Sequence, residues 1–170
     1  MENTSVAIIT LNYNQTNYTI DCIKSVLNST HRNFKIFLID NGSKKKEFKN
    51  LKENFNNNTL IEIFRLPSNI GYVGGVNFGL EKASTHNFDY FLIMNNDTLI
   101  DSQSIRELVF TSEKYNGKAI VSGKVYNYDE KDTLQIDYIK SISERIIDIQ
   151  AGHTLALIQL LGLELTRFNF

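Results

Sequence analysis

Three polar residues, Asn95, Asn96 and Asp97, directly follow the apolar segment FLIM at 91–94. The apolar segment predicts a buried strand, and the amide and carboxylate groups at its end need partners or a ligand. In open α/β sheets, ligands bind at this end of the strands. Oxygen donors of this kind suit Mg²⁺ or Mn²⁺, which link carboxylates to substrate phosphates. The same residues also suit a plain turn, so the segment alone leaves both interpretations open.

Two earlier apolar segments end in the same abrupt way. SVAIITL at 5–11 is followed by Asn12 and Tyr13, and KIFLI at 35–39 is followed by Asp40. Parallel strands end at one edge of a sheet, so we expect these side chains and the 95–97 segment to converge on one crevice. Each has a simpler alternative, because Asp40 before Asn-Gly suits a turn and Tyr13 could pack as an ordinary aromatic residue.

The segment NIGYVGGVNFG at 69–79 contains four glycines in eleven positions. Glycine loses much conformational entropy on folding, so such a cluster predicts a tight turn or a close backbone approach. It has neither the G-x-G-x-x-G spacing directly after a strand nor a Walker A lysine. We expect its backbone amides to approach a ligand, with Asn69 and Asn77 as side-chain partners, before a short helix over 76–83.

Strand and helix patterns alternate along the chain. Strands are predicted at 5–11, 35–39, 61–66, 91–94 and 119–125. One helix is predicted to begin at about residue 16, and a second to begin after Ser43, which would be its N-cap. A third is predicted to begin at a capping box at 104–107 and to end at about residue 115. The alternation predicts an α/β fold with a mostly parallel sheet and helices on both faces. The pattern loses definition after residue 129, and residues 151–165 have helical character.

The composition is that of an ordinary globular protein: 170 residues, 42% hydrophobic and 22% charged. The net charge of −1 argues against a nucleic-acid partner. We expect the single cysteine, Cys22, to pack in the core, and its isolation fits a reducing compartment. The sequence begins without a signal-peptide pattern and has no apolar segment of membrane-spanning length, so a cytoplasmic protein is expected.

A nucleoside diphosphate would give each group in the crevice a physical task. Asp40 could accept a hydrogen bond from a base imide, and Tyr13 could pack against the base or ribose. Asp97 would hold a divalent cation, which neutralises the leaving diphosphate as its charge grows.

Four segments, in this order, resemble family 2 glycosyltransferases with the GT-A fold: VAIITLNYN at 6–14, LIDNGS at 38–43, NIGYVGGVNFG at 69–79 and LIMNNDT at 92–98. The resemblance covers about residues 5–128, and Asn-Asn-Asp-Thr is similar to rhamnosyltransferase-like bacterial members. It implies inverting transfer of a sugar from a UDP- or dTDP-linked donor to a polysaccharide or lipopolysaccharide acceptor. It also implies action at the inner face of the membrane without spanning it.

The resemblance assigns site roles residue by residue. The residues implied to form the donor site are Thr10, Asn12, Tyr13, Asp40, Asn69, Gly71, Asn77, Asn95, Asn96 and Asp97. Asp40 would read the base. Asn95 and Asp97 take the outer positions of the family's Asp-x-Asp motif, with Asp97 as the metal-facing carboxylate and Asn95 as a weaker second ligand for Mg²⁺ or Mn²⁺.

The C-terminal part departs from the family pattern. The family's catalytic base usually lies in a Glu-Asp pair, and this chain has no such dipeptide. The remaining candidates are Asp129, Glu130, Asp132 and Asp137. Relatives usually continue for about another hundred residues. We therefore expect residues 1–128 to form the nucleotide-sugar-binding half, and residues 129–170 to form a divergent or truncated tail of the same, incomplete domain.

Two other functions compete with this interpretation. A non-catalytic remnant would bind only nucleotide or a protein partner. A nucleotidyltransferase should show a glycine- and basic-rich loop directly after the first strand, but residues 12–16 contain no Lys or Arg.

Overall fold

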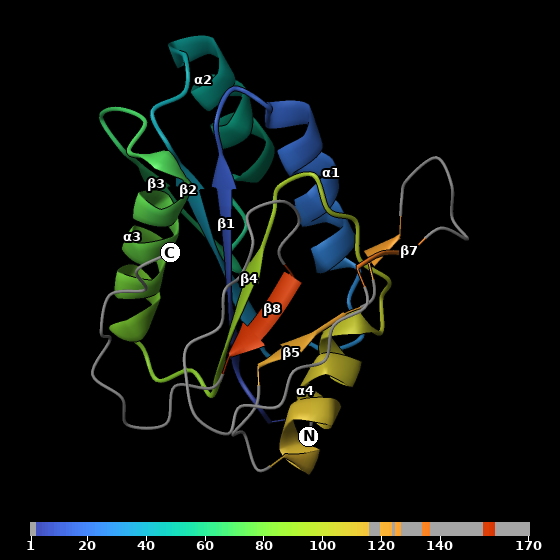
Figure 1. Cartoon of the computed structure of the whole chain (residues 1–170). Helices are drawn as coiled ribbons and strands as arrows, with labels where there is room; N and C mark the ends of the chain where they lie inside the picture. Colours follow the sequence, from blue (N-terminus) through green and yellow to red (C-terminus); the bar gives the residue numbers. More distant parts are fainter. Residues whose placement is uncertain (1–2, 116–119, 124, 127–133, 137–154, 159–170) are drawn as a thin grey trace.

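The computed structural model describes residues 3–115, 120–123, 125–126, 134–136 and 155–158. Six strands form one sheet in the order β3-β2-β1-β4-β8-β5 (Figure 1). Their bounds are β1 (Val6–Asn12), β2 (Phe34–Asp40), β3 (Ile61–Arg65), β4 (Tyr90–Met94), β5 (Val121–Ser122) and β8 (Leu155–Ile158). Strands β1 to β4 are parallel, whereas β8 is antiparallel to both of its neighbours. The prediction of an α/β fold with a mostly parallel sheet is confirmed.

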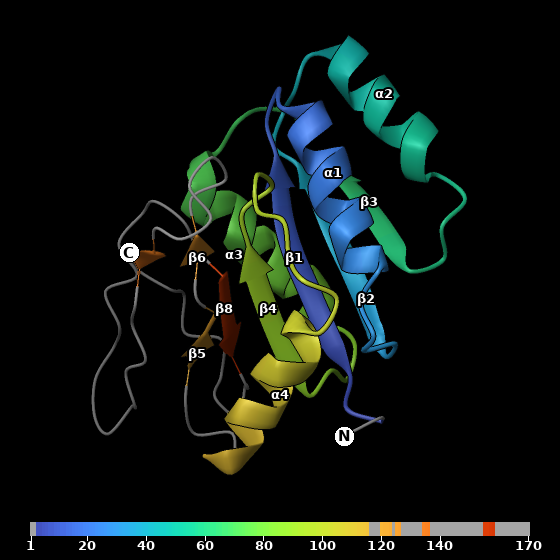
Figure 2. The same cartoon turned by 90° about the vertical axis from the view of Figure 1, so that its right-hand side faces the viewer.

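Helices cover both faces of the sheet, as predicted. Helices α1 (Thr16–Leu27), α2 (Lys45–Phe55) and α4 (Ser104–Lys114) lie on one face, and α3 (Gly71–Ser84) lies on the other. Figure 2 shows the first three in front of the sheet and α3 behind it. Neighbouring residues of one strand point to opposite faces, so Ile8 packs on the α1 side and Ile9 packs on the α3 side.

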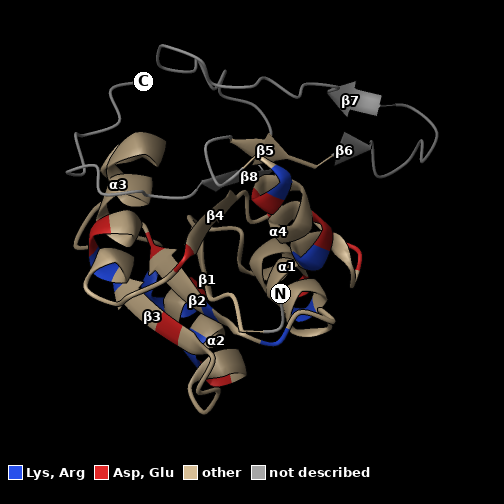
Figure 3. Ribbon diagram, turned by 90° about the horizontal axis from the view of Figure 1, so that it is seen from below, with Lys and Arg blue, Asp and Glu red and all other residues tan. Residues whose placement is uncertain are grey.

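The central strands contain continuous apolar segments because neither of their faces meets water. In β2, every residue from Ile36 to Ile39 is fully buried. Burying each such side chain contributes roughly 1.5–3 kcal/mol, which makes these strands the main source of stability. At the edge of the sheet, Lys35 of β2 forms an ion pair with Glu62 of β3. Figure 3 shows basic and acidic residues interspersed over α3, α4 and these strands.

Both predicted helix caps are wrong. The N-cap position of α2 is Lys44, and no side chain caps the helix. The hydroxyl of Ser43 instead accepts hydrogen bonds from the Asn12 side chain and the Asn14 backbone, because it faces the loop after β1. Ser104 is the first residue of α4 rather than its cap.

The helix predicted over 76–83 is present, but it begins five residues earlier, at Gly71, where a turn or loop was expected. All four glycines of the segment at 69–79 lie within this helix, α3. A Cβ atom at Gly79 would lie 2.6 Å from Cγ2 of Ile9, and one at Gly75 would overlap the side chain of Leu11. These two glycines, one helical turn apart, therefore let α3 pack closely on the sheet.

The predictions for the C-terminal part need correction. The expected strand at 119–125 is divided between β5 and β6 (Val125–Tyr126), and β6 pairs with β7 (Leu134–Ile136). The predicted helical character of residues 151–165 is wrong for 155–158, because this segment pairs as β8 with the open edge of β4. The candidate bases Asp129, Glu130, Asp132 and Asp137 lie outside the described residues.

Across the described residues, none of the helices has the length and apolar character needed to cross a membrane.

Candidate functional site

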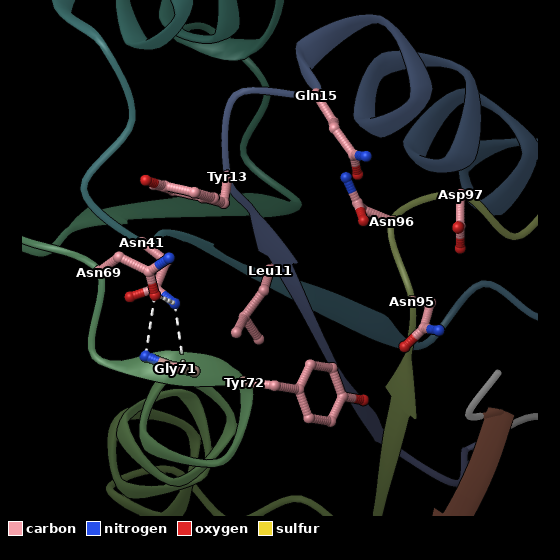
Figure 4. Close-up of a pocket in the computed structure, with 10 residues that line it drawn as sticks. All are labelled: Leu11, Tyr13, Gln15, Asn41, Asn69, Gly71, Tyr72, Asn95, Asn96 and Asp97. Atoms are coloured by element: carbon pink, nitrogen blue, oxygen red, sulfur yellow. Dashed lines mark hydrogen bonds between the residues drawn. The ribbon is translucent and has the colours of Figure 1, made fainter. Parts of the chain in front are cut away.

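A pocket of about 460 Å³ opens where the parallel strands end (Figure 4). It is lined by Leu11, Tyr13, Gln15, Asn41, Asn69, Gly71, Tyr72, Asn95, Asn96 and Asp97. Asn41, Asn69 and Gly71 lie on one side of it, and the segment from Asn95 to Asp97 lies on the other. Of these described lining residues, five have amide side chains, and the single charged one is Asp97.

The side formed by Asn41 and Asn69 is held by their own side chains. The amide nitrogen of Asn41 donates to Oδ1 of Asn69 and to the carbonyl of Gly71, each at 3.0 Å. In return, the backbone of Ile70 donates to Oδ1 of Asn41, and the backbone of Gly71 donates to Oδ1 of Asn69. These bonds fix the start of α3 at the pocket. A helix N-terminus favours anions, since its first N–H groups carry partial positive charge.

Gly42 makes this arrangement possible. Its φ of +77° is one that other residues adopt at a cost, and a Cβ atom there would lie 2.5 Å from the carbonyl carbon of Ser68. The backbone after β2 therefore packs directly on the backbone before α3. This contact brings Asn41 within reach of Asn69.

The opposite side of the pocket is the segment that follows β4. The side-chain nitrogen of Asn96 donates to Oγ1 of Thr19 on α1 at 2.9 Å. The backbone carbonyl of Asn95 accepts from the thiol of Cys22 at 3.5 Å, and the amide of Thr98 donates to the same carbonyl at 3.3 Å. Asp97 is exposed, and its carboxylate points from this segment into the pocket region (Figure 4).

Beneath the pocket lies a buried polar network. Asn12 accepts a hydrogen bond from the hydroxyl of Thr19 at 2.9 Å and donates to Asp40 and to Ser43, each at 3.0 Å. The second carboxylate oxygen of Asp40 faces Nε of Arg65 at 3.5 Å. Buried polar groups are costly without partners, so this network binds the ends of β1 and β2 together.

A family model described as glycosyl transferase family 2 matches residues 5–159. The chain belongs to this family.

Relatives and solved structures agree with that membership. The glycosyltransferase GlyG of Streptococcus pneumoniae is 23% identical over 127 residues, which are 75% of this chain and 41% of GlyG. The structure of S. aureus TarS 1–349 with UDP-GlcNAc gives a TM-score of 0.63 at 16% identity, over 72% of this chain and 35% of TarS 1–349. The chain therefore spans well under half of these proteins.

A third similar protein is the mannosyltransferase PcManGT from Pyrobaculum calidifontis, solved with GDP-Man and Mn²⁺. Its TM-score is 0.62 at 13% identity, over 69% of this chain and 34% of PcManGT. At such low identity the structural likeness concerns the fold, and it confirms the predicted GT-A architecture.

The structure of this family 2 glycosyltransferase brings six of the ten predicted donor-site residues into the pocket. They are Tyr13, Asn69, Gly71, Asn95, Asn96 and Asp97.

Thr10, Asn12, Asp40 and Asn77 are not among the residues that line the pocket, and their donor-site roles stay predictions. Thr10 and Asn12 are buried in β1, and Asn77 lies farther along α3. Asp40 is fully buried and accepts a hydrogen bond from Asn12 in the polar network beneath the pocket. Its contact with a base stays a prediction.

Four lining residues were not predicted: Leu11, Gln15, Asn41 and Tyr72. The sequence could have indicated Asn41, because it is a second polar residue, next to Asp40, at the end of the same apolar strand. Tyr72 lies in the first turn of α3 and points toward the pocket (Figure 4).

Cys22 packs in the core, as predicted, directly below the Asn95–Asp97 segment. Burial raises the pKa of its thiol to about 12, and the negative charge of Asp97 adds to this effect. The thiol therefore stays protonated at neutral pH and donates to the Asn95 carbonyl.

Among the described residues, no group of three or more His, Cys, Asp or Glu side chains is arranged so that it could hold a metal ion. The Asp97 carboxylate and the Asn95 amide oxygen nevertheless lie on one side of the pocket. A donor set of one carboxylate and one amide fits Mg²⁺ or Mn²⁺ when substrate phosphates and water supply the other ligands.

Proposed function

We propose that the pocket binds the nucleoside diphosphate of a UDP- or dTDP-linked sugar, with Mg²⁺ or Mn²⁺ held by Asp97 and Asn95. One observation carries this proposal: among the described residues that line the pocket, the single charged side chain is the exposed carboxylate of Asp97, and it faces the N-terminus of α3 across the pocket. A diphosphate without a cation would be repelled by Asp97. A divalent cation reverses that repulsion, and the helix terminus favours the same anion.

The base and ribose fit the other side of the pocket. Tyr13 is 46% exposed there and offers its ring for stacking. Both N–H groups of the Asn41 side chain are used by Asn69 and Gly71, and its oxygen accepts from Ile70, so it positions the start of α3. The side-chain NH₂ of Asn69 can donate to a base carbonyl. The TarS complex with UDP-GlcNAc and the PcManGT complex with GDP-Man and Mn²⁺ support a nucleotide-sugar ligand for this fold.

The proposed reaction is an inverting displacement. An acceptor hydroxyl attacks the anomeric carbon, its proton passes to a carboxylate base, and the nucleoside diphosphate leaves. The bound cation supplies charge neutralisation of that leaving group. The acceptor is a polysaccharide or a lipid-linked glycan, and the rhamnosyltransferase-like Asn-Asn-Asp-Thr segment favours a bacterial surface polymer. We place the reaction in the cytoplasm at the inner face of the membrane.

Replacing Asp97 tests the site. Calorimetry should show that the protein binds UDP or dTDP with Mn²⁺ present, and that Asp97→Ala abolishes the metal-dependent part of this binding. Asp101→Ala is the matched control, because this exposed carboxylate accepts a hydrogen bond from the Gln103 backbone and does not line the pocket. It should bind as the unaltered protein does.

Two results would count against the proposal. No binding of either nucleotide with metal present would exclude a donor site. Unchanged metal dependence in Asp97→Ala would remove Asp97 from it.

A nucleotide-binding module without turnover is the second candidate. It is motivated by the pocket, which accounts for nucleotide binding and does not by itself account for transfer. Sugar transfer or donor hydrolysis by the purified chain would decide in favour of the enzyme.

A further inference from the structure

Helix α1 holds the segment after β4 through three side chains. Thr19 accepts from the Asn96 side chain at 2.9 Å, Cys22 donates to the Asn95 carbonyl at 3.5 Å, and Ser25 accepts from the Ile100 backbone at 3.2 Å. Of these contacts, the Thr19 contact alone reaches a side chain that lines the pocket. The middle residue of the Asn-Asn-Asp segment is therefore tied to α1 by one hydroxyl.

Both hydrogen-bonding functions of this hydroxyl are used inside the protein. Thr19 is fully buried, and besides accepting from Asn96 it donates to Oδ1 of Asn12 at 2.9 Å, with the Gln15 carbonyl farther away at 3.2 Å. Asn12 in turn donates to Asp40 and Ser43 at the end of β2. An unbroken chain of hydrogen bonds thus runs from the Asn95–Asp97 segment, beneath the pocket, to the strand that precedes Asn41.

The Asp97 carboxylate has no comparable support of its own. It is exposed, and among the described residues no hydrogen bond fixes it. Its direction therefore depends on the backbone of residues 95–97. The Asn96 side chain anchors the middle of that backbone by its hydrogen bond to Thr19. Thr19 therefore influences the backbone positions of Asn95 and Asp97, the two neighbours of Asn96.

We propose that Thr19 is a positioning residue for the cation ligands: its hydroxyl fixes Asn96, and thereby sets the directions of Asn95 and Asp97. This inference rests on the proposed donor site. Outer groups that orient metal ligands commonly change metal affinity by about ten- to a hundredfold when removed. Here one neutral hydrogen bond is lost, so the expected effect is smaller, roughly three- to tenfold.

The test compares three variants of the full chain. Thr19→Val removes the hydroxyl with little change of shape, and Thr19→Ser keeps the hydroxyl. Thr16→Val makes the same change one turn earlier on α1, where the hydroxyl is also buried but contacts the Glu47 carbonyl at 3.4 Å. UDP and dTDP are titrated with and without Mn²⁺. Amide hydrogen exchange of residues 95–98 is measured without any ligand, with amides of β1 and β2 as the internal reference.

Thr19→Val should weaken metal-dependent nucleotide affinity by roughly three- to tenfold and leave metal-free binding unchanged. Exchange at 95–98 should quicken relative to the reference strands. Thr19→Ser should restore both properties, and Thr16→Val should match the unaltered protein.

Two outcomes would overturn the inference: unchanged metal dependence and exchange in Thr19→Val, or equal effects in Thr16→Val. If the unaltered protein binds neither nucleotide with Mn²⁺, the donor-site proposal falls. The exchange comparison then still decides whether Thr19 holds the segment.

Discussion

Replacing Gly42 by alanine should destabilise the protein through two separable effects. The φ of +77° costs a residue with a Cβ roughly 1–2 kcal/mol. The added methyl group would also lie 2.5 Å from the carbonyl carbon of Ser68 and 2.6 Å from the nitrogen of Asn69. Both atoms are backbone, so relief requires the chain to shift, at roughly 1–3 kcal/mol. The free energy of unfolding should fall by about 2–5 kcal/mol.

Gly71→Ala isolates the first effect. Gly71 has nearly the same φ, +80°, but a Cβ atom there would have nothing within 4 Å. Gly71→Ala should therefore lower the free energy of unfolding only by the cost of the positive φ, roughly 1–2 kcal/mol. Urea unfolding followed by far-ultraviolet circular dichroism suits both variants, because the sequence has no tryptophan to report by fluorescence. Equal destabilisation of the two variants would refute the argument that the chain segments are in close contact at Gly42.

Two further substitutions test the polar network and the buried thiol. Asn12→Ala removes the hydrogen bonds that the Asn12 side chain makes with Asp40, Ser43 and Thr19, so the free energy of unfolding measured in urea should fall by about 2–4 kcal/mol, against about 0.5 kcal/mol or less for the exposed Asn54→Ala. Cys22, whose pKa is raised from 9.0 to about 12, should resist thiol reagents at pH 8 until the protein unfolds. Since the folded pKa is the higher one, the stability difference between the unaltered protein and Cys22→Ala should be full below pH 9 and decline toward pH 12. Rapid labelling of the folded protein would contradict this.

The sequence located the four parallel strands to within one or two residues, because buried strands are continuous apolar segments bounded by polar ones. The same property hides which side chain at a strand end faces the pocket. Strand β2 is buried on both faces, so its sequence has no alternation from which the direction of Asp40 or Asn41 could be deduced. The structure turns Asn41 toward the pocket and buries Asp40.

The glycine-rich segment shows a second limit. Local propensity disfavours helix at residues 71–79, since glycine costs about 1 kcal/mol at each helical position. The structure overrides this because Gly75 and Gly79 are needed where α3 meets Ile9 and Leu11. That contact joins distant parts of the chain and has no signature in the segment itself.

The position of β8 has a consequence for how the protein is made. Strands β1 to β4 and their helices emerge from the ribosome first, joined by nearby connections. Strand β4, which the Asn95–Asp97 segment follows, then has one edge without a hydrogen-bonded neighbour. Strand β8 can pair with this edge only after synthesis has reached Leu155–Ile158. Unpaired edges readily add strands from other molecules, and distant pairings form slowly. Until β8 pairs, β4 is an edge strand of the sheet, as β3 is on the other side, and the segment that lines the pocket follows an unpaired strand.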